Sequence, residues 1–282
     1  MQICNRDFSR QDLEWIRRTV ESRPDLSRYE LSRLFCRQAA WRRVDGGLKD
    51  MSCRVAMLRL EQNGLIRLPP PKRKPVCSRK IKPSGPGQPQ ADIQLPCQRI
   101  ELEFEPVARK SSAVYNELIE RYHYLGYRRM GGAQLRFFVR AHGQLIALLG
   151  FSAAAWKVGA RDDFIGWTPA QRRERLHLVV DNSRFLLLPW VHGKNLASQI
   201  LATAGRRLPG FWQRRYNYKP LLLESFVEKK RFAGTCYKAA NWIYVGQTQG
   251  RGKWDRRHGC EKPVKTIWLY PLARRFKETL CK

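Results

Sequence analysis

Apolar residues in the first part of the chain, residues 1–68, recur at intervals of three and four positions. This spacing places side chains on one face of a helix. Leu13, Ile16 and Val20 predict a first helix, and Pro24 predicts its end because proline cannot continue the hydrogen-bond ladder. We therefore expect the chain to begin with a helical module.

Two further helices are expected in the same module. Ser27 is the predicted N-cap of a helix over residues 28–38, and Asp50 begins a third helix that Gly64 closes. Residues 65–70 are predicted to form a short strand, so the module resembles a winged helix-turn-helix. The alternative is a three-helix packing or dimerisation module with a solvated basic face.

The third predicted helix has an apolar stripe and a polar side. Met51, Val55 and Leu58 form the stripe that we expect to face inward. The polar side would enter a major groove of DNA, and Arg67 would lie on the wing. The residues of that side are Lys49, Ser52, Ala56, Arg59 and Asn63.

Proline and glycine interrupt the apolar pattern over residues 69–96. A segment this rich in both residues cannot build a core, so we predict a semi-extended tether. Its basic residues have no acidic neighbour and would lie along phosphates; they include Lys72, Arg73 and Lys74. The alternative role is a solubilising spacer.

From residue 97 onward the pattern mixes helices and strands, which predicts an α/β (α+β) domain over residues 97–282. Ser112 is the expected cap of its first helix, and a hairpin is expected around the turn at His142 and Gly143. Further expected elements are strands over 175–180 and 184–190 linked by Asp181 and Asn182, a helix over 196–208 and a strand over 264–272.

The stretch Leu221–Gly252 carries most of the side chains suited to chemistry. It reads as a buried strand, a short helix capped by the Thr235 hydroxyl, a second strand and a basic glycine loop. Glu224 would lie within the first strand, where an unpaired carboxylate is costly to bury. The rim of the sheet would receive Cys236, Tyr237 and Asn241.

The 282 residues include 54 Lys and Arg against 24 Asp and Glu, which gives a formal net charge of +30. Such a surplus repels itself unless a polyanion screens it, so nucleic acid is the first expected partner and an anionic membrane surface the second. No apolar run approaches the ~20 residues that span a bilayer, and the N-terminus lacks the apolar core of a signal peptide. A cytoplasmic protein is expected.

Eight cysteines are scattered along the chain, without a C-x-x-C pair and without zinc-finger spacing to a histidine. Reduced thiols are therefore expected, and a zinc site assembled across the fold is the alternative.

Carboxylates in the second domain are candidates for a nuclease or strand-transfer centre, because Mg²⁺ and Mn²⁺ need clustered oxygen ligands. The candidates are Asp162, Asp163, Asp181 and Glu224. The alternative is ion pairing, of Glu224 with Arg161 or Arg184 and of the aspartates with Arg172 or Arg173.

A second candidate centre is the short helix of the central stretch. Cys236, near a helix N-terminus, could have a lowered thiol pKa, and Tyr237 could act as an acid or attack a phosphodiester. Asn241 follows on the same rim. A buried cysteine and a hydrogen-bonded tyrosine are the alternative.

A third candidate is nucleic-acid contact by the loop QTQGRGKWDRRHG. Its glycines let backbone approach a phosphate, its basic residues supply charge and its tryptophan can stack on a base. The alternative is a flexible, solvated surface loop. The residues proposed here are Arg251, Lys253, Trp254 and Arg256, together with Arg128 and Arg129 of the run YHYLGYRR.

Several segments of the second domain resemble GNAT-type acyltransferases, namely LIALLGF, RLHLVVDNSRFLLLPWVHGKNLAS and YKAANWIYVG. The resemblance implies a mixed α/β fold and places Tyr237 where that family often has a general-acid tyrosine. It also implies a phosphate-binding turn before a helix, formed here by His192, Gly193, Lys194 and Asn195.

A second resemblance covers nearly the whole chain. The segments GLIRLPPPK, YHYLGYRRMGGAQLRF, RDDFIGW, NSRFLLLPWV and ESFVEKKRFAGTCYKAANWIYVGQTQGRG look like the DruA family, named for the Druantia anti-phage systems of bacteria. This resemblance implies a DNA-linked role in phage defence or mobile elements, with defence-system or transposition proteins as partners.

Together these patterns predict a DNA-binding protein whose two domains grip a duplex or a displaced single strand. Two alternatives stay open. One is a metal-dependent DNA nuclease or strand-transfer enzyme that uses Mg²⁺ or Mn²⁺, and the other is an acyltransferase-related enzyme that uses acyl-coenzyme A.

Overall fold

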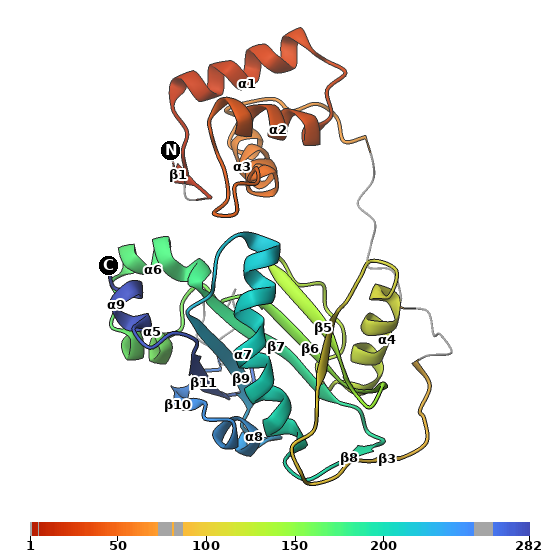
Figure 1. The fold of residues 1–282 in the computed structure, drawn as a ribbon. Coiled ribbons are helices and arrows are strands. Elements are labelled where there is room, and N and C mark those ends of the chain that lie inside the picture. The colour runs from red at the N-terminus through yellow and green to blue at the C-terminus, as the bar shows by residue number, and fades with distance from the viewer. Residues whose placement is uncertain (1, 5, 73–80, 82–86, 251–261) are drawn as a thin grey trace. The chain divides into compact units, whose positions relative to one another are not determined.

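The computed structural model describes residues 2–4, 6–72, 81, 87–250 and 262–282. The chain divides into two compact units, residues 1–79 and 80–282, which Figure 1 shows as ribbons. Each unit has a hydrophobic core of its own.

The N-terminal unit contains the three predicted helices. The Ser27 hydroxyl accepts from the Glu30 N–H at 3.1 Å, and the Glu30 carboxylate accepts from the Ser27 N–H at 2.9 Å, so the predicted cap is confirmed. The elements are β1 (Gln2–Ile3), β2 (Arg6–Asp7), α1 (Arg10–Ser22), α2 (Arg28–Gln38) and α3 (Asp50–Gln62).

The predicted orientation of α3 is wrong. Met51, Val55 and Leu58, expected to face inward, are 63%, 41% and 40% exposed. Ala56, assigned to the DNA-facing side, is fully buried. The helix has apolar residues on two sides, so periodicity alone does not predict which side is buried. The side with the smaller side chains lets the helix pack more closely against its neighbours. The buried residues are Cys53, Ala56, Met57 and Leu60.

The predicted strand over residues 65–70 does not form. Side chains satisfy its backbone instead of a partner strand. Arg28 Nε donates to the Pro69 carbonyl at 2.6 Å, and the Leu68 N–H donates to Glu61 Oε1 at 2.8 Å. The segment is therefore an extended connection and not the wing that the sequence suggested.

Part of the predicted linker belongs to the C-terminal unit. β3 (Ile93–Gln94) pairs in parallel with β8 (Val191–His192), and its isoleucine is buried. Arg121 Nη1 donates to the Gly87 carbonyl at 2.9 Å. Residues 87–96 therefore lie against the α/β domain.

A seven-stranded mixed sheet organises the C-terminal unit, in the order β10-β11-β9-β7-β6-β5-β4, and confirms the predicted α/β class. The predicted hairpin is present, and His142 and Gly143 turn it with φ of +49° and +76°. The strands are β4 (Glu103–Pro106), β5 (Gln134–Ala141), β6 (Gln144–Ala153), β7 (Val179–Leu187), β9 (Leu222–Glu228), β10 (Ile243–Gln247) and β11 (Lys265–Pro271).

Helices cover both faces of this sheet (Figure 1). Phe137 of β5 contacts Phe211 of α7, and its neighbour Phe138 contacts Tyr115 of α4, so α7 and α4 lie on opposite faces. No helix in the described part of the chain has the length and apolarity to cross a bilayer. The helices are α4 (Ser112–Tyr122), α5 (Gly159–Ile165), α6 (Pro169–Arg175), α7 (Leu196–Tyr216), α8 (Thr235–Ala239) and α9 (Phe276–Leu280).

Two predicted boundaries in this unit are wrong. Asp181 and Asn182 do not link two strands but lie inside β7, where the register with β6 shifts in a β-bulge. The Asn182 amide donates to the Gly150 carbonyl at 3.3 Å, which satisfies a backbone acceptor at the bulge. The helix expected to end at Leu208 continues past Pro209, because Leu208 and Trp212 are both buried against the sheet.

Candidate functional site

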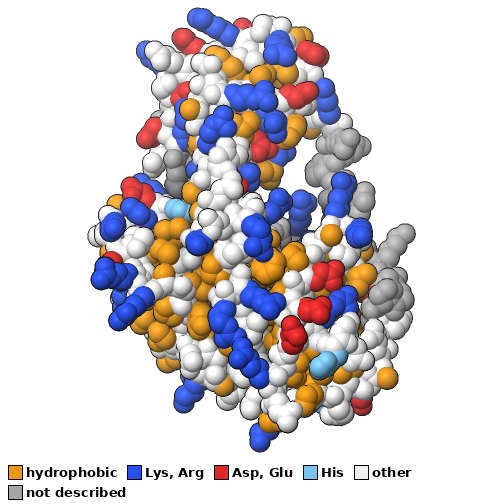
Figure 2. Space-filling model, in the orientation of Figure 1, with side chains coloured by type: hydrophobic (Ala, Val, Ile, Leu, Met, Phe, Trp, Pro, Cys, Tyr) orange, Lys and Arg blue, Asp and Glu red, His pale blue; other side chains and the backbone are white. Residues whose placement is uncertain are grey.

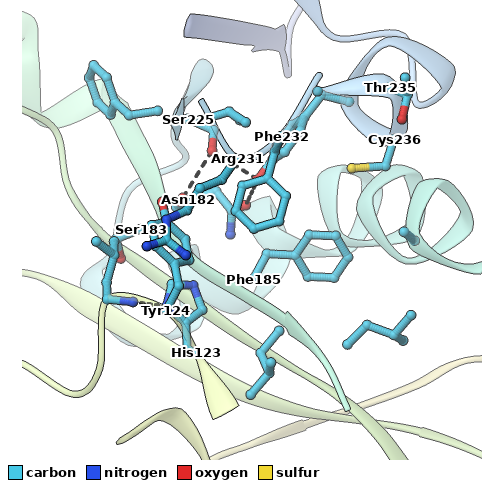
Figure 3. Close-up of a pocket in the computed structure, with 18 of the residues that line it drawn as sticks. His123, Tyr124, Asn182, Ser183, Phe185, Ser225, Arg231, Phe232, Thr235 and Cys236 are labelled. Carbon is cyan, nitrogen blue, oxygen red and sulfur yellow. Dashed lines mark hydrogen bonds between the residues drawn. The ribbon is translucent and has the colours of Figure 1, made fainter. Parts of the chain in front are cut away.

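The sheet opens between β7 and β9, the one parallel pair of neighbours among its described strands. These strands pair over only three positions, the last of which joins Asp181 to Glu224. Beyond this point they no longer pair, and a cavity of about 560 Å³ lies between them. The cavity is shown in Figure 3.

Four segments far apart in the sequence line this cleft. They are residues 122–125 after α4, positions between 182 and 187 of β7, positions 225–227 of β9, and residues 231–237. Ala197, in the first turn of α7, completes the lining.

Tyr237 lies at the buried end of the cleft. Its hydroxyl donates to Asn182 Oδ1 at 3.1 Å, and Ser225 Oγ lies 3.0 Å from that hydroxyl and 3.2 Å from the Asn182 carbonyl. Burial raises the pKa of the Tyr237 phenol well above its ordinary value. The tyrosine is therefore a neutral, hydrogen-bonded side chain that forms the floor of the cleft.

Cys236 lies in the lining beside Tyr237, but its thiol is not activated as predicted. Burial raises the pKa of this thiol, and α8, at five residues, is too short to lower it appreciably. The predicted third member of this rim, Asn241, is exposed in the turn after α8, outside the cleft. The structure therefore brings together two of the three residues.

Gly234 fixes the turn that carries these residues. It occupies the N-cap position of α8 with φ of +74°, and a Cβ built there would lie 2.7 Å from the Trp268 ring. Only glycine meets both conditions without strain. The predicted cap by the Thr235 hydroxyl is not made, so this side chain remains exposed.

An aromatic and basic wall forms the exposed end of the cleft. His123 stacks on Tyr124 with ring centroids 4.9 Å apart, and the Phe232 ring lies 5.3 Å from that of Tyr124. The Arg231 guanidinium lies over Tyr124 at 5.4 Å. Sequence reasoning missed His123, Arg231 and Phe232, since the residues come from separate segments and carry no motif.

The ionisation of His123 follows from its surroundings. Burial and the positive charge of Arg184 lower its pKa to about 4, so the ring is neutral at pH 7. Its Nδ1 accepts from the Leu125 N–H at 3.2 Å. The ring proton is therefore on Nε2, which is a hydrogen-bond donor.

The predicted carboxylate centre lies on the other face of the sheet, because Glu224 and Ser225 are neighbours in β9 and point in opposite directions. Glu224 is fully buried. Its Oε2 accepts from Arg161 Nη1 at 2.7 Å and its Oε1 from the Ala155 N–H at 2.9 Å. Both carboxylate oxygens are thus occupied.

Asp162 belongs to the same ion-pair network. Its Oδ1 accepts from Arg161 at 2.8 Å and from the Trp167 indole at 3.0 Å, and its Oδ2 accepts from Arg172 at 3.0 Å. Asp163 points away and is exposed. The ion-pair alternative is therefore the arrangement that the structure shows.

Asp181 lies beside Glu224 in the paired register, and its buried Oδ1 has no hydrogen-bond partner. Burial and the Glu224 charge raise the pKa of Asp181 well above its ordinary value. The guanidiniums of Arg161 and Arg172 bond the other two carboxylates, Glu224 and Asp162. Within the described residues, no group of three His, Cys, Asp or Glu is placed to hold a metal ion.

The predicted phosphate-binding turn is formed only in part. His192 pairs with β3, and its Nε2 lies 3.6 Å from Asp92. Asn195 is the N-cap residue of α7, with φ of +60° and no side-chain cap bond. Gly193 lies against Leu95, while Lys194 is exposed.

The predicted DNA-binding residues fall into three groups. Those on exposed surface are Arg59, Asn63, Arg67, Lys72, Arg128 and Arg129. Lys49 and Ser52 are partly buried. Those outside the described residues are Arg73, Lys74, Arg251, Lys253, Trp254 and Arg256.

A basic surface that sequence reasoning missed lies on α7. This helix contains no Asp or Glu, and its four arginines are exposed. The sequence signal was the run RRLPGFWQRR, which the Pro-Gly pair made look like a helix end. The arginines are Arg206, Arg207, Arg214 and Arg215.

Solved structures that resemble the C-terminal unit are acetyltransferases. An N-acetyltransferase from Staphylococcus aureus Mu50 is 12% identical, with a TM-score of 0.36, over 61% of this chain and 98% of that chain. A probable acetyltransferase from Staphylococcus epidermidis ATCC 12228 is 10% identical, with a TM-score of 0.39, over 61% and 100%. A GNAT-family acetyltransferase from Streptococcus pneumoniae is 11% identical, with a TM-score of 0.40, over 61% and 100%. Such distant likenesses identify neither a ligand nor a reaction.

No curated protein matches the chain. A family model does: the one described as Druantia protein DruA matches residues 59–261, which is more than half of the sequence. The match includes the strands that form the cleft, the ion-pair network and the arginines of α7. This chain belongs to the DruA family.

Proposed function

We propose that this protein binds DNA as part of a bacterial anti-phage defence system or a mobile element. The observation that carries the proposal is the row of exposed arginines on α7, in a chain with a net charge of +30. Figure 2 views the side on which α7 lies; Lys and Arg side chains are spread over it, and Asp and Glu side chains also occur there, with one group of them to the right of centre. Other defence or transposition proteins are the protein partners that we expect.

The spacing of the α7 arginines suits a phosphate backbone. Arg207 and Arg214 are seven residues apart, which places them on one face of the helix and about 10 Å apart along its axis. About three nucleotides of one strand span that distance, at about 3.4 Å each. Arg206 and Arg215 flank this face and would extend the contact to either side.

Neighbouring groups already hold these side chains in place. Arg207 Nη1 donates to the Leu102 carbonyl at 3.0 Å, and the Arg214 guanidinium lies over Phe211 at 4.7 Å. Within the described residues none of the four α7 arginines forms an ion pair with a carboxylate. An ordered and unpaired guanidinium loses less side-chain entropy on binding a phosphate.

The test compares two variants of equal charge. In one, the four α7 arginines are replaced by glutamine; in the other, the replacements are Arg109→Gln, Lys110→Gln, Arg274→Gln and Arg275→Gln, at exposed sites elsewhere in the same unit. Fluorescence anisotropy with labelled single- and double-stranded DNA should show an affinity loss of ~100-fold for the α7 variant and under ~5-fold for the control.

Equal losses in the two variants would mean that only total charge matters and that α7 is not the contact surface. No binding of either DNA by the unchanged protein would remove the proposal altogether.

A second candidate function is binding of an acyl-coenzyme A, and the divergence of β7 and β9 favours it. Beyond Asp181 and Glu224 the two strands leave each other's backbone groups unpaired beside the cavity. An extended arm that contains amides could pair with those groups as a strand does. Acetyl-coenzyme A should then raise the melting temperature of the unchanged protein, and Ala197→Trp, which fills the lining at the start of α7, should abolish the rise.

Two of the four carboxylates suggested for an Mg²⁺- or Mn²⁺-dependent nuclease, Asp162 and Glu224, belong to the ion-pair network. Because the Glu224 oxygens and Asp162 are already engaged by Arg161, Arg172 and backbone N–H groups, we do not propose cleavage as the function.

A further inference from the structure

The size of the cleft limits what can occupy it. Its volume of about 560 Å³ suits one small molecule or one residue of a polymer, and a double helix is far too wide to enter. Tyr237, Asn182 and Ser225 are buried and already hydrogen-bonded to one another at the inner end. An occupant must therefore lie near the mouth, against the wall formed by His123, Tyr124 and Phe232 (Figure 3).

The ring of Phe232 is available at this mouth. It is 49% exposed, although it is large and apolar, and one side of it lies against Tyr124. Tyr124 is itself held between the His123 ring and the Arg231 guanidinium. A flat, conjugated group stacked on Phe232 would cover exposed apolar surface on a wall that is already ordered.

Basic residues adjoin Phe232 in the chain. Lys229, Lys230 and Arg231 immediately precede Phe232, and all three are exposed. The nearest carboxylate in this segment, Glu228, is bonded to Arg231 at 3.1 Å, so neither lysine has an ion pair among the described residues, and Lys229 Nζ donates only to the neutral Gln247 side chain, at 3.3 Å. An occupant that joins a flat ring to phosphates would meet both features at once.

Hydrogen-bonding groups near the wall are also free. His123 Nε2 carries a proton and has no partner among the described residues, since Nδ1 makes the bond to Leu125. The Thr235 hydroxyl is exposed and makes no cap bond. The His123 donor beside the aromatic wall, and the Thr235 hydroxyl elsewhere in the lining, can pair with the edge of a nucleobase.

We propose that the cleft between β7 and β9 receives one unpaired base of single-stranded DNA, which stacks on Phe232 while Lys229 and Lys230 contact the adjacent phosphates. This inference rests on the proposed DNA-binding function and adds a site to it: α7 holds backbone phosphates, and the cleft holds a base. The protein then binds a displaced or single strand more tightly than a duplex of the same length.

The test removes the base and the aromatic ring separately. Affinities are measured for a single-stranded oligonucleotide and for an oligonucleotide of the same length and phosphate number in which every sugar lacks its base. The unchanged protein should bind the base-containing strand about tenfold more tightly. Phe232→Ala should bind the two alike. Trp156→Ala, which removes a ring that is 51% exposed outside the cleft, should keep the tenfold preference.

Other outcomes contradict the inference in distinguishable ways. If both strands bind equally to the unchanged protein, or if Phe232→Ala weakens both strands equally, the cleft does not hold a base although DNA binding stands. If no oligonucleotide binds, the proposed function fails, and the cleft is judged with deoxyadenosine monophosphate alone. This nucleotide should raise the melting temperature of the unchanged protein but not of Phe232→Ala, and deoxyribose 5-phosphate should have no effect; equal shifts in both proteins would remove the base site.

Discussion

Glu224 and Ser225 are neighbours in β9, and their side chains lie on opposite faces of the sheet. The two faces differ in how many of their polar groups have hydrogen-bond partners. On the Glu224 face, Arg161 and Arg172 engage two carboxylates, and the indole of Trp167 completes the network. On the Ser225 face, hydrogen bonds join only the residues at the inner end of the cleft, Ser225 and Tyr237. The wall of the same cavity has the exposed ring of Phe232 and the N–H donor of His123, which has no partner among the described residues.

This comparison indicates which kind of polar residue is expected at a ligand site. The fully buried Glu224 is the most conspicuous candidate in the sequence, and each of its carboxylate oxygens already accepts a hydrogen bond from a neighbour. His123 and Phe232 were inconspicuous, and the structure leaves them with unused surface beside a cavity. Unused bonding capacity next to a cavity indicates a ligand site better than burial alone.

The largest effect on stability should come from breaking the ion-pair network. Arg161→Ala leaves Glu224 and part of Asp162 as buried carboxylates without their cation, so the free energy of unfolding should fall by about 3–5 kcal/mol. Chemical denaturation monitored by circular dichroism measures this. Arg275→Ala, which removes an exposed arginine 3.9 Å from Glu278, should change the unfolding free energy by less than about 0.5 kcal/mol. If Arg161→Ala lowers the free energy of unfolding by less than about 1 kcal/mol, the carboxylates of the network do not depend on this cation for their burial.

A smaller effect is expected at the floor of the cleft. Tyr237→Phe removes the hydroxyl that donates to Asn182 Oδ1, so the free energy of unfolding should fall by about 1–2 kcal/mol. Denaturation curves give the value, and Tyr244→Phe, at an exposed position of the edge strand β10, should leave it unchanged. If Tyr237→Phe is also neutral, the hydroxyl is not a structural part of the floor.

The smallest change should be a gain in stability at Asp181. Because burial and Glu224 raise the pKa of this carboxyl in the folded protein, the folded state binds a proton more tightly than the unfolded chain does. The free energy of unfolding therefore falls as pH rises from about 4, the unfolded-chain value, through the folded-state pKa. Asp181→Asn should raise the unfolding free energy at pH 7 and flatten this slope. Asp163→Asn, at an exposed position, should follow the unchanged protein; a steeper slope or a loss at pH 7 for Asp181→Asn contradicts the prediction.

Features set by local sequence could be predicted well. The Ser27 cap, the hairpin at His142 and Gly143, and the strand around Glu224 depend on residues close together in the chain. The α3 face and the end of α7 could not, because each depends on which neighbouring surface an element packs against. Pro209 marked a helix end locally, and burial of Leu208 and Trp212 outweighed it.

The candidate site was predicted only in part for the same reason. Cys236 and Tyr237 are adjacent in the sequence, so their joint presence at the cleft could be expected. The wall combines His123 and Tyr124 with Phe232, more than 100 positions later, and no spacing rule connects them. The sequence predicts one of two arginines as the ion-pair partner of Glu224, and only the fold determines that the partner is Arg161.

The most direct test of DNA binding through α7 is the salt dependence of affinity for single-stranded DNA. The logarithm of the binding constant is plotted against the logarithm of the salt concentration, for the unchanged protein and for the variant with glutamine at the four α7 arginines. The slope should be steep for the unchanged protein and smaller by about 3 for the variant, since four phosphate contacts are lost. Identical slopes for the two proteins would contradict a phosphate-binding role for this helix.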